Sequence, residues 1–389
     1  MTEDIYLDNS ATTPLDQKVI QAMEPYWSRQ FGNPSSPHLL GIDAERTISS
    51  CRSQLSKLLD AKVSDLYFTA SGTEANNLAL FGVANIPFFL RNPGHIITTP
   101  MEHPSVLNVI KHLEESGWEV TYLNVDSFGR INALEVKENL RPNTKLVSVM
   151  MVNNELGTIA PIAEIGTILE GENKKRNHNI VFHVDAIQAL GKIKVNIPEL
   201  KANLMTFSAH KIFGPKGVGL LYANQEAQIR PILFGGNQEN GLRPGTENIP
   251  GIVGLTKATQ IAVENLDKNN QSLTNLRDRL LEGVDSIPQS RVNSPIDGAP
   301  HILNVSFKGV RGEVLIHFLE QRHIYCSMGA ACSSRSKETS HVLRAINLHE
   351  DELLSSIRIS LSPQITLAQI DKVVYSLRET VEEIRNIYM

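Results

Sequence analysis

The most reactive group that the sequence indicates is a lysine amine. Ser208-Ala209-His210-Lys211 directly follows the apolar run 204–207, and the glycine-rich turn 214–217 comes next. A lysine at the end of a buried strand can lose its charge by desolvation and act as an amine nucleophile. Taken alone, a lysine such as Lys211 is more often a solvated surface residue than a nucleophile, so its chemistry depends on what lies near it.

A carboxylate ends a second apolar run, 180–184. Asp185 follows this run directly, and Gln188 comes three residues later. A buried carboxylate is costly unless it pairs with a cation. The pyridinium nitrogen of pyridoxal phosphate (PLP) is such a cation, and a lysine forms the Schiff base with this cofactor. Asp185 and Lys211 are 26 residues apart, about one strand–crossover–strand unit, so both can reach one cleft. The alternative is that Asp185 only caps the next helix.

A third feature is suited to a phosphate group. Segment 70–77, Ala-Ser-Gly-Thr-Glu-Ala-Asn-Asn, joins a predicted strand to a predicted helix and contains Gly72 and Thr73. Small residues and free amides at a helix N-terminus bind phosphate well. The segment lacks the spaced glycines and the lysine of a Walker loop, and it is not the GxGxxG of a dinucleotide site. An ordinary helix cap is the alternative interpretation.

Two more polar residues follow predicted strands. His103 lies in the segment 101–105, and Asn154 lies in the segment 152–157. A planar imidazole can stack on a planar cofactor and relay protons. The alternatives are a structural or solvated histidine and a turn asparagine.

The elements that must position these residues form an alternating pattern. Most of the predicted strands are apolar throughout, which is typical of strands covered on both faces. They span 66–69, 95–98, 120–123, 146–150, 180–184, 204–207 and 218–222. Amphipathic stretches between several of them span 74–90, 104–115 and 163–174. The alternation predicts an α/β fold with a mainly parallel central sheet flanked by helices, in which ligands bind at the carboxyl ends of the strands.

The C-terminal part of the chain follows a different pattern. A long helical stretch is predicted over 250–284. Further strands are predicted over 301–307, 324–326 and 357–361, with helices over 312–322, 350–355 and 367–387. We therefore expect a large domain over 15–255 and a smaller α+β domain made of 1–14 and 256–389.

Composition excludes several classes of protein. The 389 residues include 37 Lys and Arg against 42 Asp and Glu, so the net charge of −5 is too dilute for a direct nucleic-acid footprint or a basic membrane-binding face. Three cysteines rule out a disulfide framework and suggest a reducing compartment. The N-terminus lacks the pattern of a signal peptide, and no apolar run is long enough for a membrane span. We expect a cytoplasmic protein.

The motifs, in this order, resemble those of the PLP-dependent cysteine desulfurases of the NifS/IscS type, in the class V aminotransferase group. The resemblance covers nearly the whole chain and implies PLP fold type I. The segments that carry it are 6–14, 32–38, 68–77, 102–107, 153–157, 183–188, 208–211, 243–246, 329–334, 340–343 and 358–361.

The resemblance also implies contacts with the cofactor. Lys211 would form the Schiff base, Asp185 would pair with the pyridinium nitrogen, Gln188 would contact the ring hydroxyl, and His103 would stack on the ring. The phosphate and the rest of the cofactor would be bound by Gly72, Thr73, Asn154, Ser208 and His210, and by Thr246 from the other subunit of a homodimer.

For the substrate, the resemblance implies conversion of L-cysteine to L-alanine. Asn154 and Arg358 would receive the substrate carboxylate, for which a guanidinium is suited because it can bind bidentately. Cys332 would accept the sulfur as a persulfide, since a thiolate is the competent nucleophile. His103 is the candidate for proton transfer. The sulfur would pass to an acceptor protein, for iron–sulfur cluster assembly or another sulfur-using process.

The other cysteines carry no such expectation. Cys326 lies on an apolar run and is predicted to pack, and Cys51 has no catalytic sequence partner. We predict no certain metal site, although Cys332 is a candidate for a transient iron–sulfur ligand. The catalytic cysteine loop is expected at about 326–341.

The sequence departs from the family pattern at a few places. Arg335 and Thr339 stand where NifS-like loops often have glycine and proline, Ala330 replaces a frequent serine, and Ser362-Pro363 follows the strand of Arg358. The main alternative is another fold type I PLP enzyme, an aminotransferase or a C–S or selenocysteine lyase, that does not use Cys332. A non-catalytic sulfur carrier or scaffold of the same fold is a further alternative, against which Lys211, Asp185, His103 and Arg358 speak.

Overall fold

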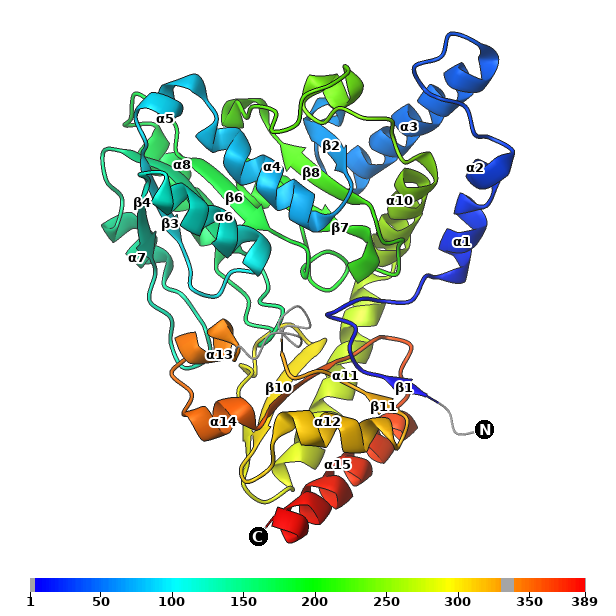
Figure 1. The fold of residues 1–389 in the computed structure, drawn as a ribbon, viewed down its shortest axis with the longest axis vertical. Coiled ribbons are helices and arrows are strands. Elements are labelled where there is room, and N and C mark those ends of the chain that lie inside the picture. The colour runs from blue at the N-terminus through cyan, green and yellow to red at the C-terminus, as the bar shows by residue number, and fades with distance from the viewer. Residues whose placement is uncertain (1–3, 330–338, 389) are drawn as a thin grey trace.

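A seven-stranded sheet forms the centre of the larger unit in the computed structural model, which describes residues 4–329 and 339–388 (Figure 1). Its strand order is β2-β8-β7-β6-β5-β3-β4. The two pairs that include β8 are antiparallel and the others are parallel, so the predicted α/β fold with a mainly parallel sheet is confirmed. The strands are β2 Leu66–Thr69, β3 His95–Thr98, β4 Glu119–Tyr122, β5 Thr144–Met150, β6 Val181–Asp185, β7 Leu204–Ser208 and β8 Gly219–Ala223.

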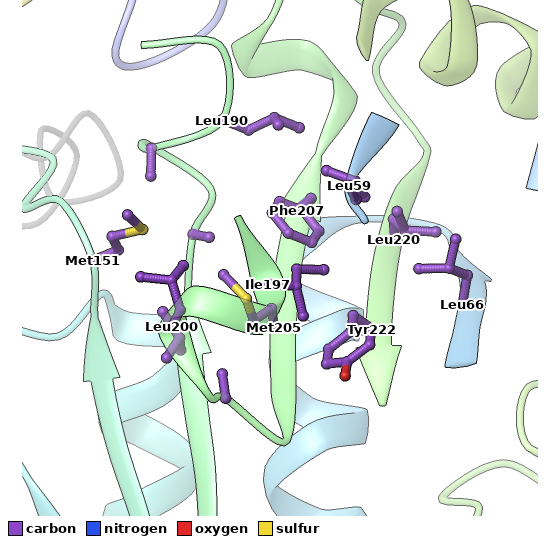
Figure 2. Packing of buried hydrophobic residues seen from close by; sticks show 14 of the residues in the cluster. Leu59, Leu66, Met151, Leu190, Ile197, Leu200, Met205, Phe207, Leu220 and Tyr222 are labelled. Atoms are coloured by element: carbon purple, nitrogen blue, oxygen red, sulfur yellow. The ribbon is translucent and has the colours of Figure 1, made fainter. Parts of the chain in front are cut away.

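Helices cover both faces of this sheet, because alternate strand residues point to opposite sides. On β7, Met205 and Phe207 join the core that includes α3 and α10, whereas Leu204 joins the core that includes α4 and α6. Figure 2 shows Met205 and Phe207 among the side chains of the first core. The helices are α1 Gln17–Met23, α2 Pro25–Ser28, α3 Leu39–Leu58, α4 Gly72–Ala84, α5 Pro87–Arg91, α6 Pro104–Glu115, α7 Ala133–Glu138, α8 Ile162–Asn173, α9 Ile197–Leu200 and α10 Ile249–Glu264.

A smaller unit has its own apolar core. It contains a three-stranded antiparallel sheet of order β12-β10-β9 and a parallel pair of β1 and β11. The helix α15 packs against both α11 and α12 around this core. The elements are β1 Ile5–Tyr6, α11 Leu266–Asp285, β9 Ser290–Val292, β10 Ile302–Phe307, α12 Gly312–Glu320, β11 Ile324–Tyr325, α13 His341–Ala345, α14 Glu350–Leu354, β12 Ser356–Ser360 and α15 Leu367–Tyr388.

Two helices predicted from periodicity are each divided in the structure. The stretch 74–90 is split into α4 and α5, because Asn85 caps α4 and Pro87 begins the next helix. The stretch 250–284 is split into α10 and α11 at Asn265, whose side chain bonds back to the carbonyl of Ile261. A local side-chain-to-backbone bond competes with the helix in this way, and apolar periodicity does not record it.

The connections place both ends of the chain beside the smaller unit. Figure 1 shows α10 beside the large sheet and α11 within the smaller unit, while β1 pairs with β11 near the N-terminus. The helix α10 packs on α3 and α11 packs on α15, so the chain passes from the larger to the smaller unit where these two helices meet. The domain limits 15–255 and 256–389 stay a prediction. Within the described ranges, no helix is both long and apolar enough to cross a membrane.

Candidate active site

A cavity lies at the carboxyl ends of β5, β6 and β7, where the sequence predicted chemistry. Its volume is about 190 Å³. Residues from the large sheet, the N-terminal segment and β12 all contribute to its wall. The lining residues are Ser10, Ala11, Ser71, Gly72, Thr73, His103, Ser105, Met150, Asn154, Asp185, Ile187, Gln188, Ser208, His210, Lys211 and Arg358.

Lys211 is the last residue of a 3-10 turn, Ala209–Lys211, that begins where β7 ends. Its Nζ donates hydrogen bonds to the main-chain carbonyls of Ser10 at 2.6 Å and Ala11 at 2.7 Å. The N-terminal segment therefore holds the amine at the cavity wall. Lys211 also lies close enough to Asp185 for its charge to lower the pKa of that carboxyl.

Asp185 ends β6 and is almost completely buried. Its Oδ2 accepts a hydrogen bond from Asn76 Nδ2 at 2.9 Å, and its Oδ1 accepts one from the Ile187 amide at 3.0 Å. Burial raises the pKa of Asp185, against the lowering effect of these two donors and of Lys211. Both of these donors are neutral, so a cationic ligand at this position would stabilise the carboxylate.

The helix α4 offers its N-terminus to the same cavity. Ser71 caps the helix by accepting from the Glu74 amide at 3.0 Å, which leaves the amides of Gly72 and Thr73 ahead of the first intrahelical bonds. A Cβ atom at Gly219 on β8 would lie 2.6 Å from the Ser71 carbonyl carbon. Glycine at position 219 therefore allows the helix N-terminus to approach the strand ends closely, and an anion is favoured there.

Gln188, Ser208 and His210 complete this side of the cavity. Gln188 Nε2 donates to the Ser10 carbonyl at 2.9 Å, and Ser208 is buried at the end of β7. His210 Nδ1 lies 3.1 Å from Thr12 Oγ1. Burial, with smaller contributions from two nearby lysines, lowers the pKa of His210 to about 4, so its ring is neutral at pH 7.

Arg358 enters the cavity from β12 on the opposite side. Its side chain is 1% exposed; one terminal nitrogen donates to the Asn154 carbonyl at 2.9 Å and the other to Asp8 Oδ1 at 2.7 Å. Its Nε is buried and has no hydrogen-bond partner among the described residues. A substrate carboxylate is the type of group that such a guanidinium binds.

Two predicted site residues are not among these lining residues. Thr246 is exposed and does not line the cavity, and Cys332 lies outside the described residues, as do Ala330 and Arg335. Cys326 packs against the small core, as predicted, and burial raises the pKa of its thiol to about 12. Burial also raises the pKa of the Cys51 thiol within the large core. Neither thiol is set up to ionise at neutral pH.

Comparison with known proteins agrees with this geometry. The family model for "Aminotransferase class-V" matches residues 5–373. The chain belongs to the class V aminotransferase family. It is 42% identical over 384 residues to a cysteine desulfurase IscS of Methanosarcina thermophila, covering 98% of this chain and 93% of the relative. It is 41% identical to a cysteine desulfurase IscS of Dictyoglomus turgidum, covering 100% and 97% of the two chains.

Solved structures similar to this chain, together with its family membership, confirm the predicted PLP fold type I. A NifS-like protein matches with a TM-score of 0.90 at 37% identity, over 98% of this chain and 99% of that one. SspA in complex with cysteine matches with a TM-score of 0.81 at 35% identity, over 93% and 100% of the two chains. The resemblance to the NifS/IscS type is confirmed as well.

The cofactor of class V aminotransferases is PLP, and the predicted cofactor is confirmed by this membership. The cavity fits such a group on its own terms: a buried carboxylate suits the ring nitrogen, a lysine amine suits the Schiff base, and a helix N-terminus suits the phosphate. Asp185, Lys211 and the segment at Gly72 and Thr73 supply these three groups. When bound, PLP supplies an electron sink for the electron pair left by bond cleavage at the substrate Cα.

Three residues that shape the site were not singled out from the sequence. Asp8 pairs with Arg358, and Asn76 and Ser105 bond to one another and to Asp185 and His103. All three lie inside motif segments that were recognised. A polar residue that lies in such a segment, at a position predicted to be buried by the strand and helix pattern, is the sequence signal that could identify them.

Proposed function

We propose that the protein is a cysteine desulfurase that converts L-cysteine to L-alanine and leaves the sulfur on Cys332. The observation that carries this proposal is the full-length similarity to cysteine desulfurases at about 40% identity. The cavity supports it by joining an amine and a buried carboxylate to a buried arginine suited to an amino-acid carboxylate. The C–S bond of cysteine breaks and an S–S bond to Cys332 forms. The proton lost from the Cys332 thiol accounts for the third hydrogen of the alanine methyl group.

Lys211 is the group that moves the proton at the substrate Cα. Its amine is held by the carbonyls of Ser10 and Ala11, and a neutral amine at this position can take that proton and return it. Asp185 would hold the ring nitrogen of the bound cofactor and would stabilise positive charge on that nitrogen. Arg358 and Asn154 orient the substrate by its carboxylate.

We further propose a homodimer in which Thr246 reaches the site of the partner subunit. Thr246 is exposed, as such a role requires. Several large apolar side chains are also exposed, including Trp27, Phe31, Leu39 and Phe234. The sulfur acceptor is a protein, and an iron–sulfur scaffold is one candidate for it.

The reaction products distinguish this function from the alternatives. Purified, PLP-loaded protein supplied with L-cysteine and a thiol reductant should release equal amounts of alanine and sulfide, with a change in the visible absorbance of the cofactor on cysteine addition. A C–S lyase that eliminates sulfide would instead give pyruvate and ammonia. An absorbance that cysteine does not change, with neither product formed, would favour a non-catalytic carrier and contradict the proposal.

Substitution Arg358→Lys should weaken cysteine binding more than turnover. Lysine keeps the positive charge but loses the fork that reaches Asp8 and the Asn154 carbonyl together. We expect KM for L-cysteine to rise on the order of 10- to 100-fold with a much smaller change in kcat, because one charge-assisted binding contact is lost. Arg52→Lys, at a half-buried arginine paired with Glu239, is the control and should leave KM unchanged. An unchanged KM in the Arg358 variant would contradict its carboxylate-binding role.

A further inference from the structure

Nδ1 of the His103 ring faces two hydrogen-bond donors of Ser105, the backbone amide and the hydroxyl. His103 is the N-cap of α6, and its Nδ1 accepts a hydrogen bond from the backbone amide of Ser105 at 3.1 Å. The Ser105 hydroxyl oxygen lies 2.8 Å from the same nitrogen. A backbone amide can only donate, so Nδ1 carries the lone pair and the ring proton of neutral His103 is on Nε2.

The hydroxyl of Ser105 is oriented by a buried amide. Asn76 is 0% exposed, and its Nδ2 donates to Ser105 Oγ at 2.8 Å and to Asp185 Oδ2 at 2.9 Å. The orientation of this amide is fixed because its Oδ1 accepts from Thr206 Oγ1 at 2.6 Å. Ser105 Oγ therefore already accepts one hydrogen bond, and its own O–H donates to His103 Nδ1. A continuous chain links Asp185 to His103.

Burial, together with the charges around His103, favours the neutral ring. Burial, followed by the charges of Lys211 and His341, lowers the pKa of His103 to about 4. Glu102, the preceding residue, does not offset this effect, because burial raises its pKa to about 8 and leaves it mostly protonated at pH 7. Asp185, the carboxylate at the end of β6, is linked to His103 through Asn76 and Ser105.

We propose that Asn76 and Ser105 are positioning residues that hold His103 as the Nε2–H tautomer, with this N–H available to the cavity. Nε2 makes no hydrogen bond within the described parts of the chain, and the ring lines the cavity. A neutral histidine at a helix N-terminus serves as a hydrogen-bond donor to developing negative charge in other enzymes.

The role of His103 in the reaction rests on the proposed function. In that reaction, its Nε2–H stabilises negative charge on the reacting groups. Lys211 then remains the base. This assignment restricts the proton-transfer role predicted for His103 to that of a donor through Nε2–H, because Ser105 occupies the lone pair on Nδ1.

The tautomer can be read directly by NMR of the full-length holoenzyme labelled with ¹⁵N-histidine. Two-bond nitrogen–proton correlations separate the two neutral tautomers and the imidazolium, and the signal of His103 among the 12 histidines is the one lost in His103→Gln. We expect the Nε2–H form from about pH 8 down to about pH 5. An Nδ1–H form, or an imidazolium at pH 7, would overturn the proposal without requiring any positioning variant to fold.

Substitution Ser105→Ala tests the contribution of the hydroxyl. Losing one of two donors to Nδ1 should make that nitrogen easier to protonate, so the His103 pKa should rise by about one unit. Ser116→Ala, at an exposed serine following the other end of α6, should leave the titration unchanged. An identical titration in Ser105→Ala and wild type would refute the role of Ser105. The readout is independent of alanine production, so its failure is distinguishable from failure of the proposed function.

Discussion

Replacing Lys211 by alanine should abolish both the visible absorbance of the bound cofactor and turnover of L-cysteine. Lys211 is the lysine that reaches the cavity beside Asp185, and its amine is held there by two main-chain carbonyls. Without the amine there is no Schiff base and no group positioned for proton transfer at Cα. We expect the rate of alanine formation to fall by ~10³-fold or more. Absorbance spectra and an alanine assay measure both effects.

The matched control is Lys194→Ala, at an exposed lysine that pairs with Glu199 on the surface. This variant should keep the spectrum and the rate of wild type. Thermal unfolding of both variants separates loss of chemistry from loss of structure. Alanine production by Lys211→Ala at the wild-type rate would refute the assignment of the amine.

Replacing Cys332 by serine should remove desulfurase activity while leaving PLP bound. The cofactor contacts predicted from Asp185, Lys211 and the N-terminus of α4 do not include this thiol, so the visible spectrum should remain. Alanine formation should fall to background, because a serine hydroxyl is not a competent nucleophile toward the substrate sulfur at neutral pH. An aminotransferase or a lyase that does not use Cys332 would be almost unaffected, so this variant separates the proposed function from its main alternative.

Cys326→Ala is the control for this experiment. Burial raises the pKa of the Cys326 thiol to about 12, so it is not ionised under the assay conditions. Its replacement should therefore leave the yield of alanine per cofactor unchanged. Loss of activity in Cys326→Ala with retention in Cys332→Ser would reverse the assignment of the nucleophile.

Much of the fold could be predicted because most strands of the central sheet are short and apolar. The ranges predicted for 66–69 and 95–98 coincide with β2 and β3, and the other strands of this sheet differ by two residues or fewer at each end. The antiparallel placement of β8 could not be read from its residues, because a buried strand has the same apolar pattern in either direction. The breaks at Asn85 and Asn265 depend on local caps that periodicity does not record.

The main groups of the site could also be predicted, since each follows a strand and motif order ties them to one family. The contacts that orient these groups join residues far apart in the chain. Asp8 and Arg358 are 350 residues apart, and Asn76 and Asp185 are 109 apart. No local pattern specifies such pairs, because each depends on how the N-terminal segment and α4 pack against the strand ends.

The destination of the substrate sulfur tests the central claim most directly. The holoenzyme would be incubated with L-cysteine carrying a heavy sulfur isotope, without reductant, and digested for mass spectrometry while alanine is measured in the same sample. The proposed reaction predicts one labelled sulfur on the peptide that contains Cys332, together with one alanine for each label. Alanine or pyruvate formed with no label on Cys332 would contradict it.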